Sequence, residues 1–241
     1  MANSRTEKEL LIEIVEYFDT YIFENHINAA LKVHSKLKSY NINPIVVKYL
    51  SKVLEGNYSP KGVAKALYYP RVLGTSINTS FGTRIQNMFV ELHIADGSLI
   101  PGMDIEFHDK IDNRKKWCQL KSGPNTINSE DVKPLIKKFT NTIQLARTNR
   151  ALKDVNNTDF IVGVLYGDTT ELSMHYKEID KFHPVIVGKD FWYRITGYTN
   201  FYDGLVSALH EKINNLDTKD FIKIGCDELA EEIKNSPLFH F

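Results

Sequence analysis

The fold is decided by two short segments, GMDIEF (Gly102–Phe107) and KWCQLKSG (Lys116–Gly123). Both are apolar runs with polar residues at alternate positions, which predicts β-strands, because successive side chains of a strand point to opposite faces. The polar residues of each strand then share one face: Asp104 and Glu106 in the first strand, and Gln119 and Lys121 in the second.

A turn-prone sequence, Lys110-Ile111-Asp112-Asn113, lies between the two segments and predicts that they form an antiparallel hairpin. Two carboxylates, an amide and an ammonium group could then meet on one patch of the sheet. Such a patch suits a divalent metal ion and a phosphate group. The alternative interpretation is a half-exposed hairpin whose charges are only solvated.

The residues after the second strand favour the first interpretation. Ser122–Asp131 is a Gly-Pro turn rich in short polar side chains, and a helical pattern follows it. Backbone N–H groups at the start of a helix bind phosphate oxygens readily. We therefore take Asn125, Thr126 and Asn128 as candidate DNA-binding residues, with turn and helix-cap chemistry as the equally weighted alternative.

These residues carry a family resemblance. An Asp, a turn and a second strand that ends in (E/D/Q)-x-K resemble the PD-(D/E)XK nucleases, and QLKSGPNTIN (Gln119–Asn128) resembles type II restriction endonucleases, in particular those that cut GGNCC-centred sites. The resemblance spans roughly residues 75–198. Two positions depart from the pattern: Gly102-Met103 precedes Asp104 where many members have Pro, and Gln119 stands where Glu or Asp is usual.

The resemblance implies a Mg²⁺-dependent hydrolysis of double-stranded DNA that leaves 5′-phosphate ends. The implied metal ligands are Asp104, Gln119, the Leu120 backbone carbonyl and Glu91, an acid on the preceding helix. Since an amide is a neutral ligand, Glu91 or Glu106 would restore the charge that Gln119 lacks. Lys121 would orient or deprotonate the attacking water. A palindromic site implies a homodimer, and a cognate DNA methyltransferase is expected in the same cell.

Composition limits the remaining classes of function. The 241 residues carry a formal net charge of zero, which disfavours a protein that coats nucleic acid without specificity. The positive charge is local: residues 132–153 contain no acid and include, among other basic residues, Lys133, Lys137 and Lys138, which we expect to face the DNA backbone, the alternative being a solvated helix surface. The polar N-terminus and the absence of a long apolar run predict a cytoplasmic protein without a membrane span. Two cysteines, Cys118 and Cys226, form no disulfide framework.

The pattern along the chain predicts an α/β fold in which a mixed central sheet is flanked by helices. Further strands are expected at 160–167 and 184–188, and helices at 9–21, 27–37, 44–54, 82–95, 128–152, 202–213 and 226–234. We expect an N-terminal helical subdomain over residues 1–70 and a nuclease core with C-terminal helices over residues 71–241.

Two other functions remain open at this point. The protein could be a repair or junction-resolving nuclease of the same fold, or a DNA-binding protein that lost its activity with the acid at position 119. His108 falls on the same strand face as Asp104 and is a weaker candidate for a general base or a metal ligand.

Overall fold

The computed structural model describes residues 5–148, 155–218 and 220–241. It divides into two compact units. The sheet unit comprises Met1–Val15 and Gly82–Glu211, and the helical unit comprises Glu16–Phe81 and Lys212–Phe241. The expected boundary at residue 70 lies within the helical unit, and the C-terminal helix α10 (Phe221–Lys234) packs on helix α4 (Pro60–Pro70) of that unit.

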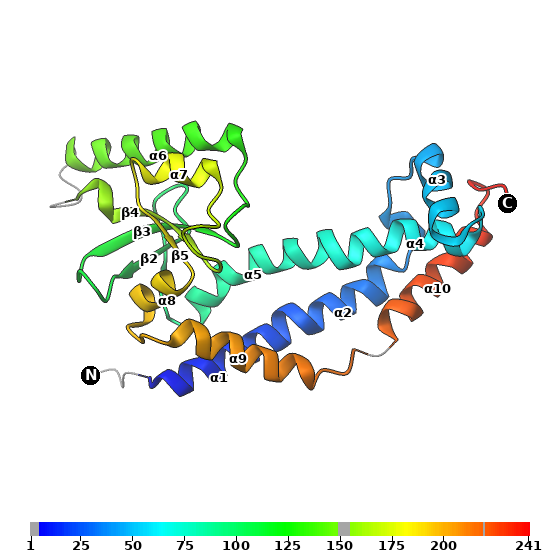
Figure 1. Ribbon diagram of the computed structural model, residues 1–241, viewed down its shortest axis with the longest axis horizontal. Helices are drawn as coiled ribbons and strands as arrows, with labels where there is room; N and C mark the ends of the chain where they lie inside the picture. The colour runs from blue at the N-terminus through cyan, green and yellow to red at the C-terminus, as the bar shows by residue number, and fades with distance from the viewer. Residues whose placement is uncertain (1–4, 149–154, 219) are drawn as a thin grey trace. The chain divides into compact units, whose positions relative to one another are not determined.

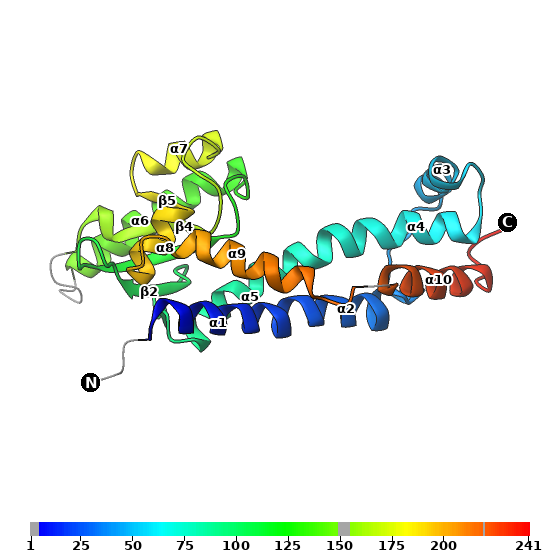
Figure 2. The same cartoon turned by 60° about the horizontal axis from the view of Figure 1, so that its bottom comes forward.

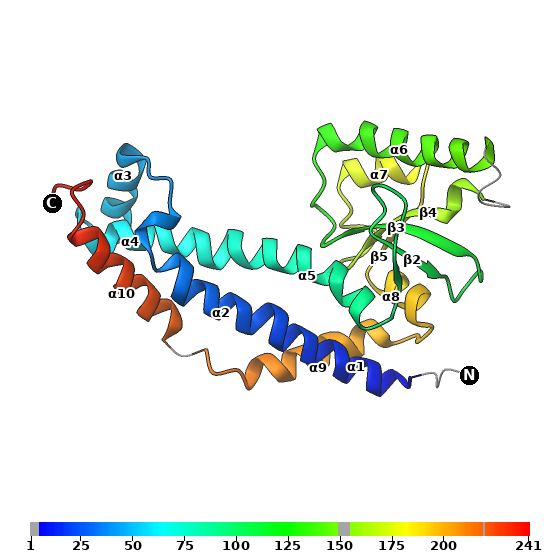
Figure 3. The ribbon, with the colours of Figure 1, turned by 180° about the vertical axis from the view of Figure 1, so that it is seen from behind.

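The sheet has five strands in the order β1-β2-β3-β4-β5. Their bounds are β1 (Asp96–Gly97), β2 (Ile105–His108), β3 (Lys115–Lys121), β4 (Phe160–Val164) and β5 (Val185–Val187). The first three strands pair antiparallel, whereas β3, β4 and β5 pair parallel. The sheet is therefore mixed, and the predicted hairpin is confirmed as β2 and β3 (Figure 3). Glu106 lies opposite Trp117 in this pair.

Helices cover both faces of this sheet (Figure 1). Helix α6 (Ser129–Thr148) and helix α7 (Met174–Asp180) lie on one face, where a buried core joins Leu135 and Phe139 of α6 to Trp117 of β3 and Val162 of β4. Helix α8 (Lys189–Thr196) covers the other face. The positions expected for the end of the α6 pattern, 149–152, lie outside the described residues, as do Arg150 and Lys153 of the basic stretch.

The alternation predicted for the hairpin holds in the structure. Trp117, which pairs with Glu106, packs in the core under α6, whereas Phe107 contacts Phe191 of α8 on the opposite face, with 6.3 Å between the ring centroids. Cys118 pairs with Ile105 and is fully buried, so it serves as a small core residue. The face that carries Asp104, Gln119 and Lys121 is therefore the face that α6 covers.

The helical unit is built from helices on a separate apolar core. Its elements are the π-helical segments η1 (Asp19–Glu24), η2 (Ala30–His34) and η4 (Arg71–Ser76), the short η3 (Leu37–Ser39), and helices α2 (Asn25–Ala29), α3 (Pro44–Glu55), α4 and α10. Helices α4 and α10 lie side by side (Figure 2) and bury Tyr68 and Leu229 in one cluster. Asn43 caps α3 by accepting hydrogen bonds from two backbone N–H groups, and Pro44 occupies the first turn, as expected.

Three helices contain residues of both units, namely α1 (Glu7–Phe18), α5 (Ile77–Glu91) and α9 (Phe201–Asn214). The short η5 (Asn157–Asp159) leads into β4. In the part of the chain that the structure describes, every helix is too short or too polar to cross a bilayer.

Candidate active site

Asp104 lies directly before β2 and is held against β3. Its carboxylate oxygen Oδ2 accepts a hydrogen bond of 2.7 Å from the N–H of Leu120. Leu120 stands between Gln119 and Lys121, so this bond fixes the first motif residue beside the second motif. Burial raises the pKa of Asp104 above its ordinary value, although the Leu120 N–H and the charges of Lys121 and Lys138 act in the opposite direction.

Gln119 and Lys121 point from β3 toward α6 and line a cavity of about 250 Å³. The other lining residues are Ile127, Asp131, Pro134, Leu135 and Lys138. The Oε1 atom of Gln119 is buried and has no hydrogen-bond partner among the described residues. An unsatisfied buried acceptor costs roughly 1–3 kcal/mol, so this oxygen is suited to a ligand that enters the cavity.

Lys138 reaches the site from α6. Its side chain passes over Gly102, where a Cβ atom would stand only 1.6 Å from the Nζ atom. Gly102 also has a φ of +86°, a conformation that favours glycine. Gly102, which stands shortly before Asp104 where many family members have Pro, therefore leaves room for the side chain of Lys138.

The other acids proposed from the sequence are placed less favourably. Glu106 lies on the same face as Asp104, but its Oε1 accepts a hydrogen bond of 2.7 Å from Ser98 and its Oε2 forms an ion pair of 2.5 Å with Lys115. Although burial acts to raise the pKa of Glu106, these partners lower it overall. Glu91 is exposed at the end of α5, and neither acid lines the Gln119 cavity.

His108 and the polar turn residues have separate positions. His108 is exposed at the end of β2. The hydroxyl of Thr126 donates a hydrogen bond to the Gly123 carbonyl, and it also forms a hydrogen bond with the Tyr176 hydroxyl, both at 2.9 Å. Asn125 and Asn128 are exposed. Thr126 therefore makes turn contacts, and the DNA-binding role of Asn125, Thr126 and Asn128 stays a prediction.

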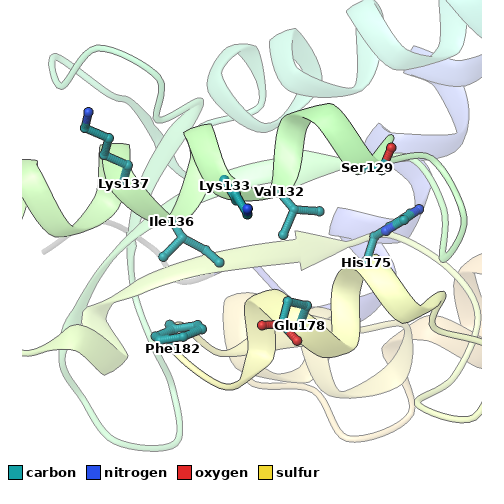
Figure 4. A pocket seen from close by; sticks show the side chains of 8 residues that line it. All are labelled: Ser129, Val132, Lys133, Ile136, Lys137, His175, Glu178 and Phe182. Carbon is teal, nitrogen blue, oxygen red and sulfur yellow. The ribbon is translucent and has the colours of Figure 1, made fainter.

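The three lysines expected to face DNA lie on two sides of α6. Lys133 and Lys137 line a groove of about 520 Å³ between α6 and α7, together with the apolar Val132, Ile136 and Phe182 (Figure 4). Ser129, His175 and Glu178 complete its lining. Lys138 instead lines the cavity of Gln119 and Lys121. The basic stretch is therefore not one uniform surface.

The chemistry of the donor set fits a hard divalent cation. Within the described residues, no group of three or more His, Cys, Asp and Glu side chains could hold a metal ion. A carboxylate, the unpartnered amide oxygen of Gln119 and a backbone carbonyl are, however, oxygen ligands of the kind that Mg²⁺ accepts. Asp104, Gln119 and Leu120 are the residues that would hold it.

The comparisons with known proteins decide the family. The model of type II restriction endonuclease EcoO109I matches residues 30–217, which include the hairpin, the Gln119 cavity and α6. The chain belongs to this family of restriction endonucleases. The resemblance to type II restriction endonucleases is thereby confirmed, and the mixed sheet flanked by helices is consistent with a restriction endonuclease-like fold. The comparison with curated proteins found no match.

The sequence pattern indicated no role for Asp131, and it did not indicate that Lys138 lines a different cavity from Lys133 and Lys137. Asp131, Leu135 and Lys138 recur at steps of four and three residues, which places them on one side of a helix. Lys133 and Lys137 recur at a step of four on another side. This periodicity was readable in the sequence, but which side would face β3 was not.

Proposed function

We propose that this protein is a Mg²⁺-dependent, site-specific type II endonuclease of the PD-(D/E)XK type, which acts on double-stranded DNA as a homodimer. The observation that carries the proposal is the hydrogen bond between the Asp104 carboxylate and the Leu120 N–H. It brings Asp104 beside Gln119 and Lys121 on the side of the sheet where the cavity lies.

Each residue has a distinct task in this proposal. When bound, Mg²⁺ would stabilise charge on the phosphoryl oxygens. Lys121 orients or deprotonates the water that attacks phosphorus. Lys121 and Lys138 offset the negative charge that develops on the phosphate. The water gives up a proton to Lys121 or to solvent as its oxygen bonds to phosphorus. The bond from phosphorus to the 3′ oxygen breaks, and that oxygen takes up a proton from solvent, which leaves a 5′-phosphate and a 3′-hydroxyl.

The decisive experiment is digestion of plasmid DNA of mixed sequence with and without Mg²⁺, followed by sequencing of the fragment ends. We expect Mg²⁺-dependent fragments whose ends share one sequence, with a phosphate on every 5′ end. Cutting at branched structures alone would indicate a junction-resolving nuclease. Intact plasmid that is nevertheless bound would indicate a silent DNA-binding protein. Methylation of the shared sequence by a cognate methyltransferase should block cleavage.

The two positions of the α6 lysines lead to a separate prediction. The DNA-backbone role proposed for Lys133, Lys137 and Lys138 means that replacing all three with alanine weakens binding to every sequence. The slope of log K against log salt should become shallower by about 0.9 for each lost phosphate contact. Fluorescence anisotropy with duplex DNA at several salt concentrations measures this slope, and an unchanged slope would mean that these lysines are only solvated.

The same lysines can be separated by their effect on cleavage. Lys138→Ala should lower the single-turnover cleavage rate of bound DNA, because Lys138 lies close enough to influence Asp104. The Lys133→Ala, Lys137→Ala double variant serves as the control, since both side chains line the other groove. It should weaken binding while bound DNA is cleaved at the normal rate. Equal effects of the two variants on cleavage would contradict separate roles.

A further inference from the structure

The proposed metal site lacks a second negative charge, because Gln119 stands where an acid is usual. Asp104 is the one carboxylate assigned to it so far, and the side chain of Gln119 is neutral. Lys121 and Lys138 both place positive charge near Asp104. Hard divalent cations prefer anionic oxygen. Glu106 is held by Ser98 and Lys115, and Glu91 does not line the cavity, so neither acid expected from the sequence is well placed to restore the charge.

Asp131 is the carboxylate residue that does line this cavity, together with Gln119, Lys121 and Lys138. It lies in the first turn of α6, on the side that faces β3. The cavity volume of about 250 Å³ is well above the roughly 10–15 Å³ that a single water needs. A divalent ion that keeps some of its water shell therefore fits in the cavity that Asp131 and Gln119 both line.

No ion pair of Asp131 is found among the described residues, so its charge is not already neutralised by a basic side chain. A carboxylate in the first turn also stabilises a helix through the helix dipole, by about 0.3–1 kcal/mol. Glu130 stands in the same first turn and can make that contribution as well. Since Glu130 does not line the cavity, it separates the two roles and provides a matched control.

We propose that Asp131 supplies the second carboxylate of the metal site and replaces the charge that Gln119 lacks. The inference rests on the proposed function, because it concerns the same metal ion. The second carboxylate of the site then comes from the first turn of α6 instead of from β3, and it lines the same cavity. Asp131 and Gln119 are then partners in one site, so the effects of changing them should depend on each other.

The test measures Mn²⁺ binding to the DNA-free protein by electron paramagnetic resonance of the free ion. Asp131→Asn should weaken Mn²⁺ binding by about tenfold, which corresponds to about 1.4 kcal/mol. Glu130→Gln should leave Mn²⁺ affinity unchanged. In a Gln119→Glu background, Asp131→Asn should cost much less affinity, because the strand then carries its own carboxylate. Thermal unfolding of each variant verifies that it is folded.

Three outcomes would overturn the inference. Either Asp131→Asn and Glu130→Gln have the same effect on Mn²⁺ affinity, or Asp131→Asn costs the same in both backgrounds. Failure of the wild-type protein to bind Mn²⁺ would also overturn it. The proposed function fails differently, because a protein that binds Mn²⁺ through Asp131 but leaves plasmid DNA intact would retain the inference and lose the nuclease activity.

Discussion

Cleavage of plasmid DNA is expected to fall by at least ~10²–10⁴-fold when either Asp104 or Lys121 is replaced with alanine. In the proposed mechanism the two side chains act on the same phosphate with opposite charge, Asp104 as a metal ligand and Lys121 on the attacking water. We expect neither residue to be needed to hold the DNA, because contacts more remote from the reacting phosphate should supply most of the affinity. The predicted signature is therefore loss of cleavage with retained binding.

The measurement compares single-turnover cleavage in Mg²⁺ with duplex binding in EDTA, where no divalent ion bridges Asp104 and the phosphate. Asp104→Ala should bind DNA as tightly as the wild type or more tightly, because a carboxylate near the phosphate has been removed. Lys115→Ala is the matched control for Lys121→Ala. Lys115 begins the same strand, is partly exposed, and pairs with Glu106 rather than with the cavity residues. Cleavage at the normal rate by Asp104→Ala or Lys121→Ala would remove the assignment of that residue.

The hairpin was predictable because its physics is local. A period of two fixes which side chains share a face, and a short turn fixes the pairing of the strands. Asp104 and Gln119 therefore had to approach each other once both segments became strands. The strong apolar runs at β4 and β5 were predictable for the same reason, since β4 is buried along its whole length.

The packing of a helix over the hairpin depends on contacts between residues far apart in the sequence, so the sequence did not reveal it. Asp131 and Lys138 reach the site only because a particular side of α6 packs on β3, and that choice is made by Leu135 and Phe139 in the shared core. The same holds for α10, which follows the sheet unit in sequence but buries Leu229 in the helical unit. Periodicity identifies the apolar side of a helix but not its partner.

Charges also gave an incomplete prediction. Glu106 matched Asp104 in spacing, yet Ser98 and Lys115 occupy its carboxylate. Neither partner could be inferred from the hairpin alone, because Ser98 lies beyond β1 along the chain. The buried ion pair at the start of β3 was likewise not anticipated. Lys116 looks like an ordinary strand charge in the sequence, but its side chain is only 2% exposed.

This ion pair holds the end of β3 that lies away from the site. Lys116 Nζ is 3.2 Å from Asp159 Oδ1 and 2.6 Å from Asp112 Oδ2. Asp159 also accepts hydrogen bonds from Arg114 and from the backbone N–H of Asn156. Although burial acts to raise the pKa of Asp159, these donors lower it below the ordinary range.

Asp159→Asn should therefore destabilise the sheet unit by about 3–5 kcal/mol, because it leaves the buried Lys116 charge without its buried partner. Asp112→Asn is the control. Asp112 contacts the same ammonium group, but its side chain is 36% exposed, so the expected cost is at most about 1 kcal/mol. Urea unfolding followed by tryptophan fluorescence measures the loss of unfolding free energy in both variants. It reports on the sheet unit, because the two tryptophans, Trp117 and Trp192, belong to that unit.

The pH dependence gives this prediction an independent check. The folded-state pKa of Asp159 lies below its unfolded value, so its contribution to stability is present above the unfolded pKa and is lost as pH falls through the folded one. The difference in unfolding free energy between wild type and Asp159→Asn should thus be constant near neutral pH and shrink in acid. A difference that persists unchanged at acidic pH, or a cost equal to that of Asp112→Asn, would show that the charge of Asp159 does not anchor β3.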